Sequence, residues 1–304
     1  MRIFRLSVFV TMLMLLSFST LQAQLVVKTN RTVNDLVKNV LAGGGVDIIN
    51  IQYSVGTGNI GFFNGKKSNI GLDSGLILST GKVIDAIGPN NMGNQGSSNN
   101  LPGDADLQLL SPNFPTYDAT WISFAFSPQA NQVKFRFVFA SEEYPESIAK
   151  NFNDVFGFFI AGPGFTGAQN IALVPATLDP ISIQTINANT NSSYYIDNTN
   201  GASVQFDAFT KVIEITANVQ PCENYTLKFA PYFRRLTEQF ISFDNFLKKS
   251  NDQLSKLFST LSVYPLIFLY IEFSRKEQKI SKIQELRADK FASEACGDSK
   301  IFIN

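Results

Sequence analysis

The sequence contains no histidine among its 304 residues, and it has only two cysteines and one tryptophan. Histidine is the commonest general base and supplies the ligands of HExxH zinc sites, so its absence excludes histidine-based catalytic triads and zinc sites of that type. The two cysteines, Cys222 and Cys296, are too few for a disulfide framework. We therefore do not expect an enzyme.

Charged residues are also scarce, at 16% of the chain, and their signs cancel, since 25 Lys and Arg stand against 25 Asp and Glu. Within residues 24–230, however, there are 11 basic and 16 acidic residues, a net charge of −5. An acidic body offers no surface for the phosphates of DNA or RNA, and no basic stripe with interleaved aromatics occurs in it. We therefore do not expect nucleic acid as a partner.

The first 23 residues have the pattern of a secretory signal peptide. Arg2 and Arg5 provide the charged start, the run from Leu6 to Phe18 is apolar, and Ala23 is the small residue expected before a cleavage site. The alternative is an N-terminal helix buried in the fold. We favour the signal peptide, which predicts an exported protein, extracellular or associated with the outer membrane at the cell surface.

One amphipathic helix is expected directly after the mature N-terminus. Thr32 can cap it, with Asp35 three residues further on, and apolar residues recur with helical spacing as far as Leu41. The three glycines at 43–45 end this pattern.

From there to about residue 230 the apolar pattern changes to a period of two. Apolar residues occupy every second position from Val133 to Phe139, which predicts a half-buried strand. Further short strands are expected at Trp121–Phe126, Phe156–Ala161, Ile171–Val174, Ile181–Ile186, Val212–Ala217 and Tyr225–Phe229. Because turns rich in Gly, Pro and Asn separate them, we predict a mainly β fold: a jelly-roll-like β-sandwich with one N-terminal helix, in a domain of residues 24–230.

Beyond about residue 230 the pattern predicts a helical tail, residues 231–304. Its segment 257–273 is almost continuously apolar, at the lower limit of length for a transmembrane helix, although Pro265 and Glu272 interrupt it. We weigh a membrane span that tethers the protein against a helix buried in the fold, and we favour the span. A charged helix is expected after it, from Arg275 to about Ala295.

Several short motifs follow one another in a fixed order along the predicted β domain. They are SNIGLDSGLILSTG (68–81), GPNN and PGDADL (within 88–107), FASEEYPE (139–146), FNDVFGFFIAGPG (152–164), QNIALVPAT (169–177), YYIDN (194–198) and PCENYTLKFA (221–230). Together they resemble the choice-of-anchor L domain, a family of bacterial surface and secreted proteins, over about residues 36–230. The resemblance implies an exported β-sandwich of adhesion or ligand-binding type, with no established catalytic residues.

The chain departs from the family pattern at two places. Members usually continue past the PC-x-x-Y-x-L-K strand into an Asp/Gly-rich segment, whereas here the sequence PYFRR follows at 231–235. The resemblance therefore implies that the last strand is missing or supplied differently. Members also often carry a cysteine near the position of Ala149, so Cys222 is expected to lack a partner.

The tail carries a second, shorter resemblance. Glu285, Ala288 and Asp289 match the E-x-x-A-D helix of HtpX-type membrane zinc endopeptidases, in which the glutamate is the third zinc ligand after two histidines. Since this chain has no histidine, we expect neither zinc nor protease activity. The resemblance implies an alternative interpretation, a fusion or chimeric gene product that carries the inactive end of such an enzyme.

Acidic residues in Gly/Pro-containing turns form the best candidate site. Calcium takes about six to eight oxygen ligands from carboxylates and loop carbonyls, which the loops of a sandwich can supply. The candidate ligands are Glu142, Glu143, Asp154, Asp104 and Asp106, with Glu146 nearby. One alternative is that these are solvated turn acids; the other is a hydrolase using Glu142 and Glu143, which is disfavoured because neighbours on a strand point to opposite faces.

These observations favour an exported surface module for binding or adhesion, stabilised by calcium. We expect its partner to be an extracellular glycan or protein, and its tail to provide a membrane tether.

Overall fold

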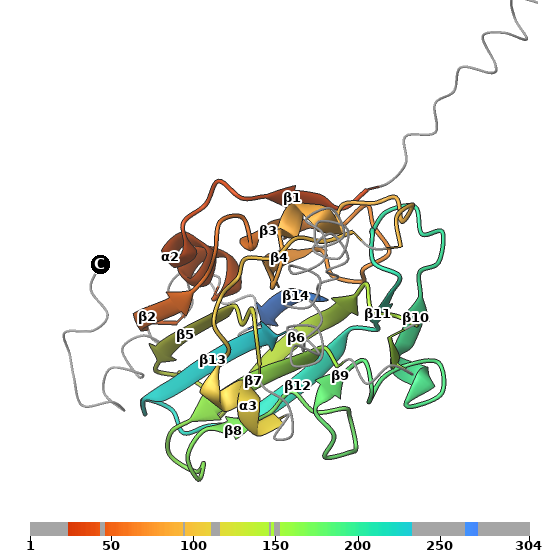
Figure 1. Ribbon diagram of the computed structural model, residues 1–304. Coiled ribbons are helices and arrows are strands. Elements are labelled where there is room, and N and C mark those ends of the chain that lie inside the picture. Colours follow the sequence, from red (N-terminus) through yellow and green to blue (C-terminus); the bar gives the residue numbers. More distant parts are fainter. Residues whose placement is uncertain are drawn as a thin grey trace, which may run out of the picture.

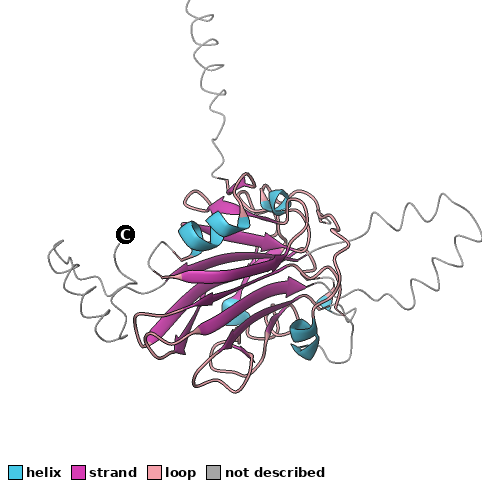
Figure 2. Cartoon of the chain, turned by 90° about the vertical axis from the view of Figure 1, so that its left-hand side faces the viewer, coloured by secondary structure: helices cyan, strands magenta, loops and turns pink. Residues whose placement is uncertain are grey.

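The computed structural model describes residues 24–42, 46–93, 95–110, 116–145, 147–148, 153–232 and 265–272. Two antiparallel sheets pack face to face in it (Figures 1 and 2). This arrangement confirms the prediction of a mainly β sandwich.

Sheet A has eight strands and sheet B has six among the described residues. Sheet A runs in the order β1-β3-β4-β14-β6-β11-β10, with β12 also paired to β6, and sheet B in the order β2-β5-β13-β7-β8, with β9 paired to β7. The strands of sheet A are β1 (Val26–Lys28), β3 (Ile60–Asn64), β4 (Ser74–Ser79), β6 (Gln132–Ser141), β10 (Tyr195–Asp197), β11 (Ala208–Thr210), β12 (Ile213–Asn218) and β14 (Pro265–Glu272). Those of sheet B are β2 (Ile48–Ser54), β5 (Trp121–Phe126), β7 (Val155–Ala161), β8 (Gln169–Asn170), β9 (Ile181–Ser182) and β13 (Tyr225–Tyr232).

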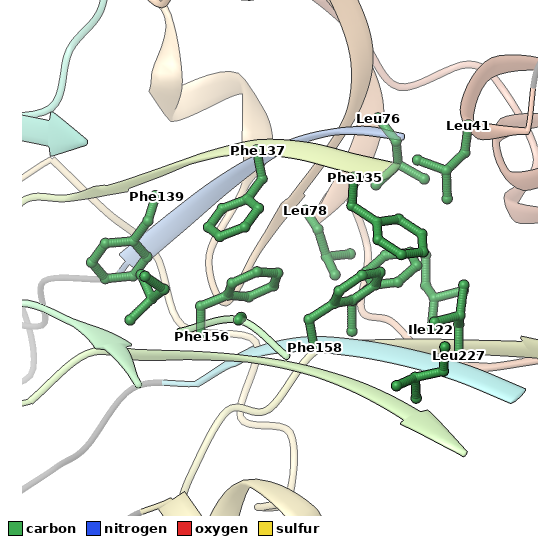
Figure 3. Close-up of a cluster of buried hydrophobic side chains, with 14 of the residues drawn as sticks. Leu41, Leu76, Leu78, Ile122, Phe135, Phe137, Phe139, Phe156, Phe158 and Leu227 are labelled. Atoms are coloured by element: carbon green, nitrogen blue, oxygen red, sulfur yellow. The ribbon is translucent and has the colours of Figure 1, made fainter. Parts of the chain in front are cut away.

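Phenylalanines on facing strands fill the space between the sheets. Every second residue of β6 points inward and meets the inward residues of β7 (Figure 3). The ring centroids of Phe135 and Phe158 are 4.6 Å apart in an edge-to-face arrangement, and those of Phe137 and Phe156 are 5.0 Å apart. Such aromatic pairs contribute about 0.5–1.5 kcal/mol beyond their buried area. The period of two in the sequence therefore decides which side chains form the core.

A second apolar layer covers the outer face of sheet A. Val138 and Ala140 of β6 pack there with Ile77, Phe206 and Phe209. The prediction of a half-buried strand is therefore wrong for the second half of β6, which is buried on both faces. The sequence pattern misses this because the residues that pack on this face are distant from β6 in the chain.

The predicted N-terminal helix is present in two parts. Helix α2 (Val33–Asp35) continues into a π-helical segment, η1 (Leu36–Leu41), and the backbone N–H of Asp35 donates to the Thr32 hydroxyl at 3.2 Å. This is the predicted N-cap. Three further helical elements lie within the described residues: α3 (Ala105–Leu110) and the single turns η2 (Val83–Ala86) and η4 (Ser192–Tyr194).

Two predicted strands are shorter than expected. At the predicted strand Ile171–Val174, strand structure ends at Asn170, and at Ile181–Ile186 only Ile181 and Ser182 are in a strand. Polar side chains take the place of a neighbouring strand here: Asn170 Oδ1 accepts from the backbone N–H of Phe158 and of Ala172, and the Thr185 hydroxyl accepts from that of Ser182. Side-chain bonds of this kind compete with regular pairing.

The apolar tail segment contributes the central strand β14. Its residues 265–272 lie between β4 and β6 and pair antiparallel with both: Leu269 is opposite Leu76 on one side and Phe137 on the other (Figure 1). For these residues the predicted helical membrane span at 257–273 is wrong, and so is the helical tail, while 257–264 and 273 lie outside the described residues. A run of apolar residues fits a buried strand as well as a helix, which is why periodicity did not separate the two.

Sheet A thus includes a strand from beyond the predicted domain end near residue 230. A strand is supplied from later in the chain, which matches one of the two alternatives that the family resemblance implied. No helix in the described part of the chain is long and apolar enough to span a membrane. The predicted helix 275–295, with the residues that resemble a zinc endopeptidase, lies outside the described residues.

Cys222 is disulfide-bonded, so the expectation that it lacks a partner is wrong. The other half of the bond lies outside the described residues. Cys222 itself occupies a tight turn before β13, with a positive φ of 65°.

Replacing Phe268 by proline should destabilise the sandwich. Proline removes a backbone donor from the interior of a sheet and leaves the facing carbonyl unsatisfied, at a cost of about 1–3 kcal/mol. Denaturant unfolding of the Phe268→Pro and Phe268→Leu variants would measure this, because leucine keeps the N–H. Equal stabilities of the two variants would contradict the placement of β14.

Candidate functional site

The five predicted calcium ligands fall into two separate groups. Glu142, Glu143 and Asp154 lie where β6 ends and β7 begins, and we call them the carboxylate corner. Asp104 and Asp106 lie at the start of α3, on the outer face of sheet B, where they contact Lys228; we call these three the lysine clamp. The sequence did not indicate that sheet B separates the two groups.

The carboxylate corner is held by local hydrogen bonds. The Ser141 hydroxyl, at the end of β6, donates to Asp154 Oδ2 at 2.6 Å and accepts from the backbone N–H of Glu143 at 2.9 Å. On the other side, the backbone N–H of Ile183 donates to the Asp154 carbonyl at 3.1 Å. One serine therefore joins the ends of the two strands whose phenylalanines form the core.

All three carboxylates of the corner are buried. Glu142, Glu143 and Asp154 are 1%, 4% and 0% exposed. Burial raises the pKa of Asp154 well above its ordinary value, and the nearby Glu143 raises it further, while the Ser141 hydrogen bond opposes them. Burial also raises the pKa of Tyr144, with smaller effects from Tyr195 and Asp154. Negative charge on Asp154 is therefore costly, and a proton or a cation would relieve it.

One oxygen of the corner and one of the residue before Asp154 are buried without a hydrogen-bond donor. They are Oδ1 of Asn153 and Oδ1 of Asp154, on consecutive residues. Oxygens of this kind are suitable calcium ligands. Among the residues that the structure describes, however, no three Asp, Glu, Cys or His side chains lie close enough to hold a metal ion, and Glu146 lies outside that set. Calcium at the corner stays a prediction, with amide and carbonyl oxygens completing the ligand set.

The lysine clamp was not predicted. Lys228 Nζ lies 2.6 Å from Asp104 Oδ2 and 2.6 Å from Asp106 Oδ2, and 5.2 Å from the centre of the Trp121 ring. An ammonium group therefore contacts both of these predicted calcium ligands. The only signal in the sequence was a single lysine in the apolar strand β13. It indicates an ion pair only once the structure shows that Asp104 and Asp106 lie against it.

A glycine makes room for the helix of the clamp. Gly157 lies on the outer face of β7, and a Cβ there would come within 2.8 Å of Leu107 and 2.5 Å of the Phe159 ring. The absence of a side chain lets α3 pack closely on the sheet, with Leu107 fully buried against Val155 and Phe159. This packing brings Asp104 and Asp106 to Lys228.

A third polar feature is the loop of residues 88–103, which we call the amide-rich loop. Its side chains anchor it at both ends: Asn90 Nδ2 donates to Asp207 Oδ1 at 3.0 Å, and Asn99 Nδ2 donates to the Thr80 carbonyl at 2.8 Å. Between these anchors Gln205 Nε2 donates to the Met92 carbonyl at 2.6 Å. The side chain of Met92 is nevertheless 55% exposed, and Asn91 is exposed beside it.

The raised pKa of Asp154 predicts a specific pH dependence. Its proton is held more tightly in the folded state than in the unfolded state, so its contribution to stability is present at low pH and is lost as the pH rises from about 4 through the folded pKa. Asp154→Asn should abolish this part of the slope. Denaturant unfolding between pH 4 and 8 in chelator would measure it, with Asp197→Asn as the exposed control. Parallel curves for wild type and Asp154→Asn would contradict the raised pKa.

Comparison with known proteins gives one clear relationship. The family model described as the choice-of-anchor L domain matches residues 25–231, which span the two sheets, the carboxylate corner, the lysine clamp and the amide-rich loop but not β14. Neither the curated proteins nor the solved structures include a match. The match covers more than half of the chain, which therefore belongs to the choice-of-anchor L family of exported, surface-associated modules.

Proposed function

We propose that this protein is a non-catalytic binding module of the cell surface, and that the amide-rich loop contacts its ligand, an extracellular glycan or protein. The observation that carries the proposal is the combination of anchored backbone and exposed side chains in that loop. Asn90 and Asn99 fix the loop to the sandwich, while Asn91 and Met92 face solvent.

An anchored loop suits binding for an energetic reason. Ordering a flexible loop on association costs about 0.5–1.5 kcal/mol for each immobilised side chain, and a loop that is already held avoids much of this cost. Exposed amides can donate to and accept from hydroxyl or peptide groups, and Met92 adds an adaptable apolar contact. Loops on a rigid sandwich commonly serve recognition.

The composition supports a function without catalysis. The chain has no histidine to act as a general base. Glu142 and Glu143, the remaining acid pair that we considered for hydrolysis, are 1% and 4% exposed. A buried pair is poorly placed to reach a glycosidic or peptide bond of a large substrate.

Calcium at the carboxylate corner is the second part of the proposal. Asp154 is fully buried next to Glu143, and one of its oxygens has no hydrogen-bond donor. A cation there would replace the proton that burial otherwise favours on Asp154. Since the corner joins the ends of β6 and β7, a bound ion would stabilise the whole sandwich and not only one loop.

The binding proposal predicts a loss of affinity on substitution in the amide-rich loop. The full chain would be tested on an array of bacterial and host glycans and on fixed bacterial cells. Asn91→Ala and Met92→Ala should each weaken the observed binding about tenfold, or about 1.4 kcal/mol. Leu178→Ala, at a residue that is 89% exposed elsewhere, serves as the control. Unchanged affinity in both loop variants, or release of cleaved product, would contradict the proposal.

The calcium proposal predicts a shift in thermal stability. A ligand at about 100 times its Kd stabilises the folded state by about 2.7 kcal/mol, which corresponds to roughly 5–10 °C in Tm for a domain of this size. Melting curves in millimolar calcium and in chelator should therefore differ for wild type and for Asp197→Asn. Asp154→Asn should abolish the difference. If the wild-type protein melts identically in calcium and in chelator, the calcium proposal is wrong and the acids of the carboxylate corner are ordinary turn residues.

A further inference from the structure

The lysine clamp brings an amine and two carboxylates into direct contact in a partly buried site. Lys228 Nζ lies 2.6 Å from one oxygen of each aspartate. The side chains of Lys228 and Asp104 are only 18% and 8% exposed, and that of Asp106 is 37% exposed. An ordinary surface ion pair such as Lys134 with Glu214 is longer, at 3.0 Å, and more open, at 38% and 47% exposed.

We propose that Lys228 and Asp104 condense to form an intramolecular isopeptide bond, with Asp106 as the catalytic residue that carries the protons. This covalent link would join α3 to β13, across 124 positions of the chain. It goes beyond the binding function and does not depend on it.

The two oxygens of Asp104 are arranged for this reaction. Oδ1 accepts the backbone N–H of Asp106 at 3.1 Å and that of Leu107 at 3.2 Å. Two such donors would stabilise the negative charge that develops on Oδ1 when an amine attacks Cγ. Oδ2, the oxygen that contacts Lys228 Nζ, is the one that leaves. Asp104 is therefore the acceptor carboxylate, and the more exposed Asp106 remains intact.

The reaction balances without any further reagent. The ammonium of Lys228 gives one proton to Asp106 Oδ2, and the free amine pair attacks Cγ of Asp104 to form the C–N bond. The Cγ–Oδ2 bond then breaks, and Oδ2 departs as water with two of the three ammonium protons, one of them delivered by Asp106. Asp106 ends as a carboxylate again, so one positive and one negative charge are lost together with one water.

Position and surroundings favour condensation over the ion pair. Groups held in reactive contact reach effective concentrations of about 10⁵–10⁸ M, far above what free amine and acid attain in water. Trp121 lies over the ammonium, and Leu107 and Phe159 on the same face are buried. Low exposure limits the hydration that otherwise stabilises the separated charges.

Mass spectrometry of the purified full-length chain tests the bond. Under reducing conditions the intact mass should be lower by one water than the sequence requires. Trypsin does not cut after an acylated lysine, so peptide 83–134 should be recovered covalently joined to peptide 212–234. Lys134 and Glu214, the more open ion pair, should remain unlinked and serve as the internal control.

Three variants assign the roles. Lys228→Arg keeps the positive charge and Asp104→Ala removes the acceptor; both should restore the full mass. Asp106→Ala keeps both bonding partners and should also restore it, and a linked Asp106→Ala variant would overturn the role of Asp106. Circular dichroism should first show that the wild-type protein is folded as β-sheet. If this folded protein has the full mass and gives separate peptides 83–134 and 212–228, the proposal is wrong.

Discussion

The contact between the phenylalanines of β6 and those of β7 sets the positions of the other features. Phe135 and Phe137 pack against Phe158 and Phe156, which fixes the spacing and the register of the two sheets. The same register brings the last residue of β6, Ser141, to the residue before β7, Asp154. It also turns Val155 and Phe159 outward, where α3 packs and delivers two aspartates to Lys228. Core packing therefore determines where each polar group lies.

Much of the fold could be predicted from the sequence, and the features that could not be predicted share one cause: they depend on contacts between distant parts of the chain. The strand β5 and the N-terminal helix with its Thr32 cap are encoded by periodicity and capping over a few residues. The strand β14 cannot be predicted in this way, because an apolar run has the same composition in a membrane helix and in a central strand. What decides between them is the space between β4 and β6, which local sequence does not show.

The candidate sites illustrate the same division. The acidic residues were recognisable as a group, but their separation by sheet B depends on pairings between distant strands. Asp104 and Asp106 are bound by a lysine that lies more than a hundred residues further along the chain. Asp154 instead lies fully buried next to Glu143, a second acid, and both burial and this neighbour raise its pKa. The two acidic groups therefore differ in their chemistry. The ammonium of Lys228 neutralises charge on Asp104 and Asp106, whereas a proton or a cation would relieve the cost of charge on the buried Asp154.

The position of β14 has a consequence for the order of folding. This strand is synthesised after all the other described strands, yet it lies in the interior of sheet A, with Leu76 on one side and Phe137 on the other opposite its Leu269. Before it arrives, β4 and β6 have no partner along their facing edges, so sheet A cannot close. Pairings between such distant segments form slowly. Sheet A therefore stays open until residues 265–272 have been synthesised and have paired with β4 and β6.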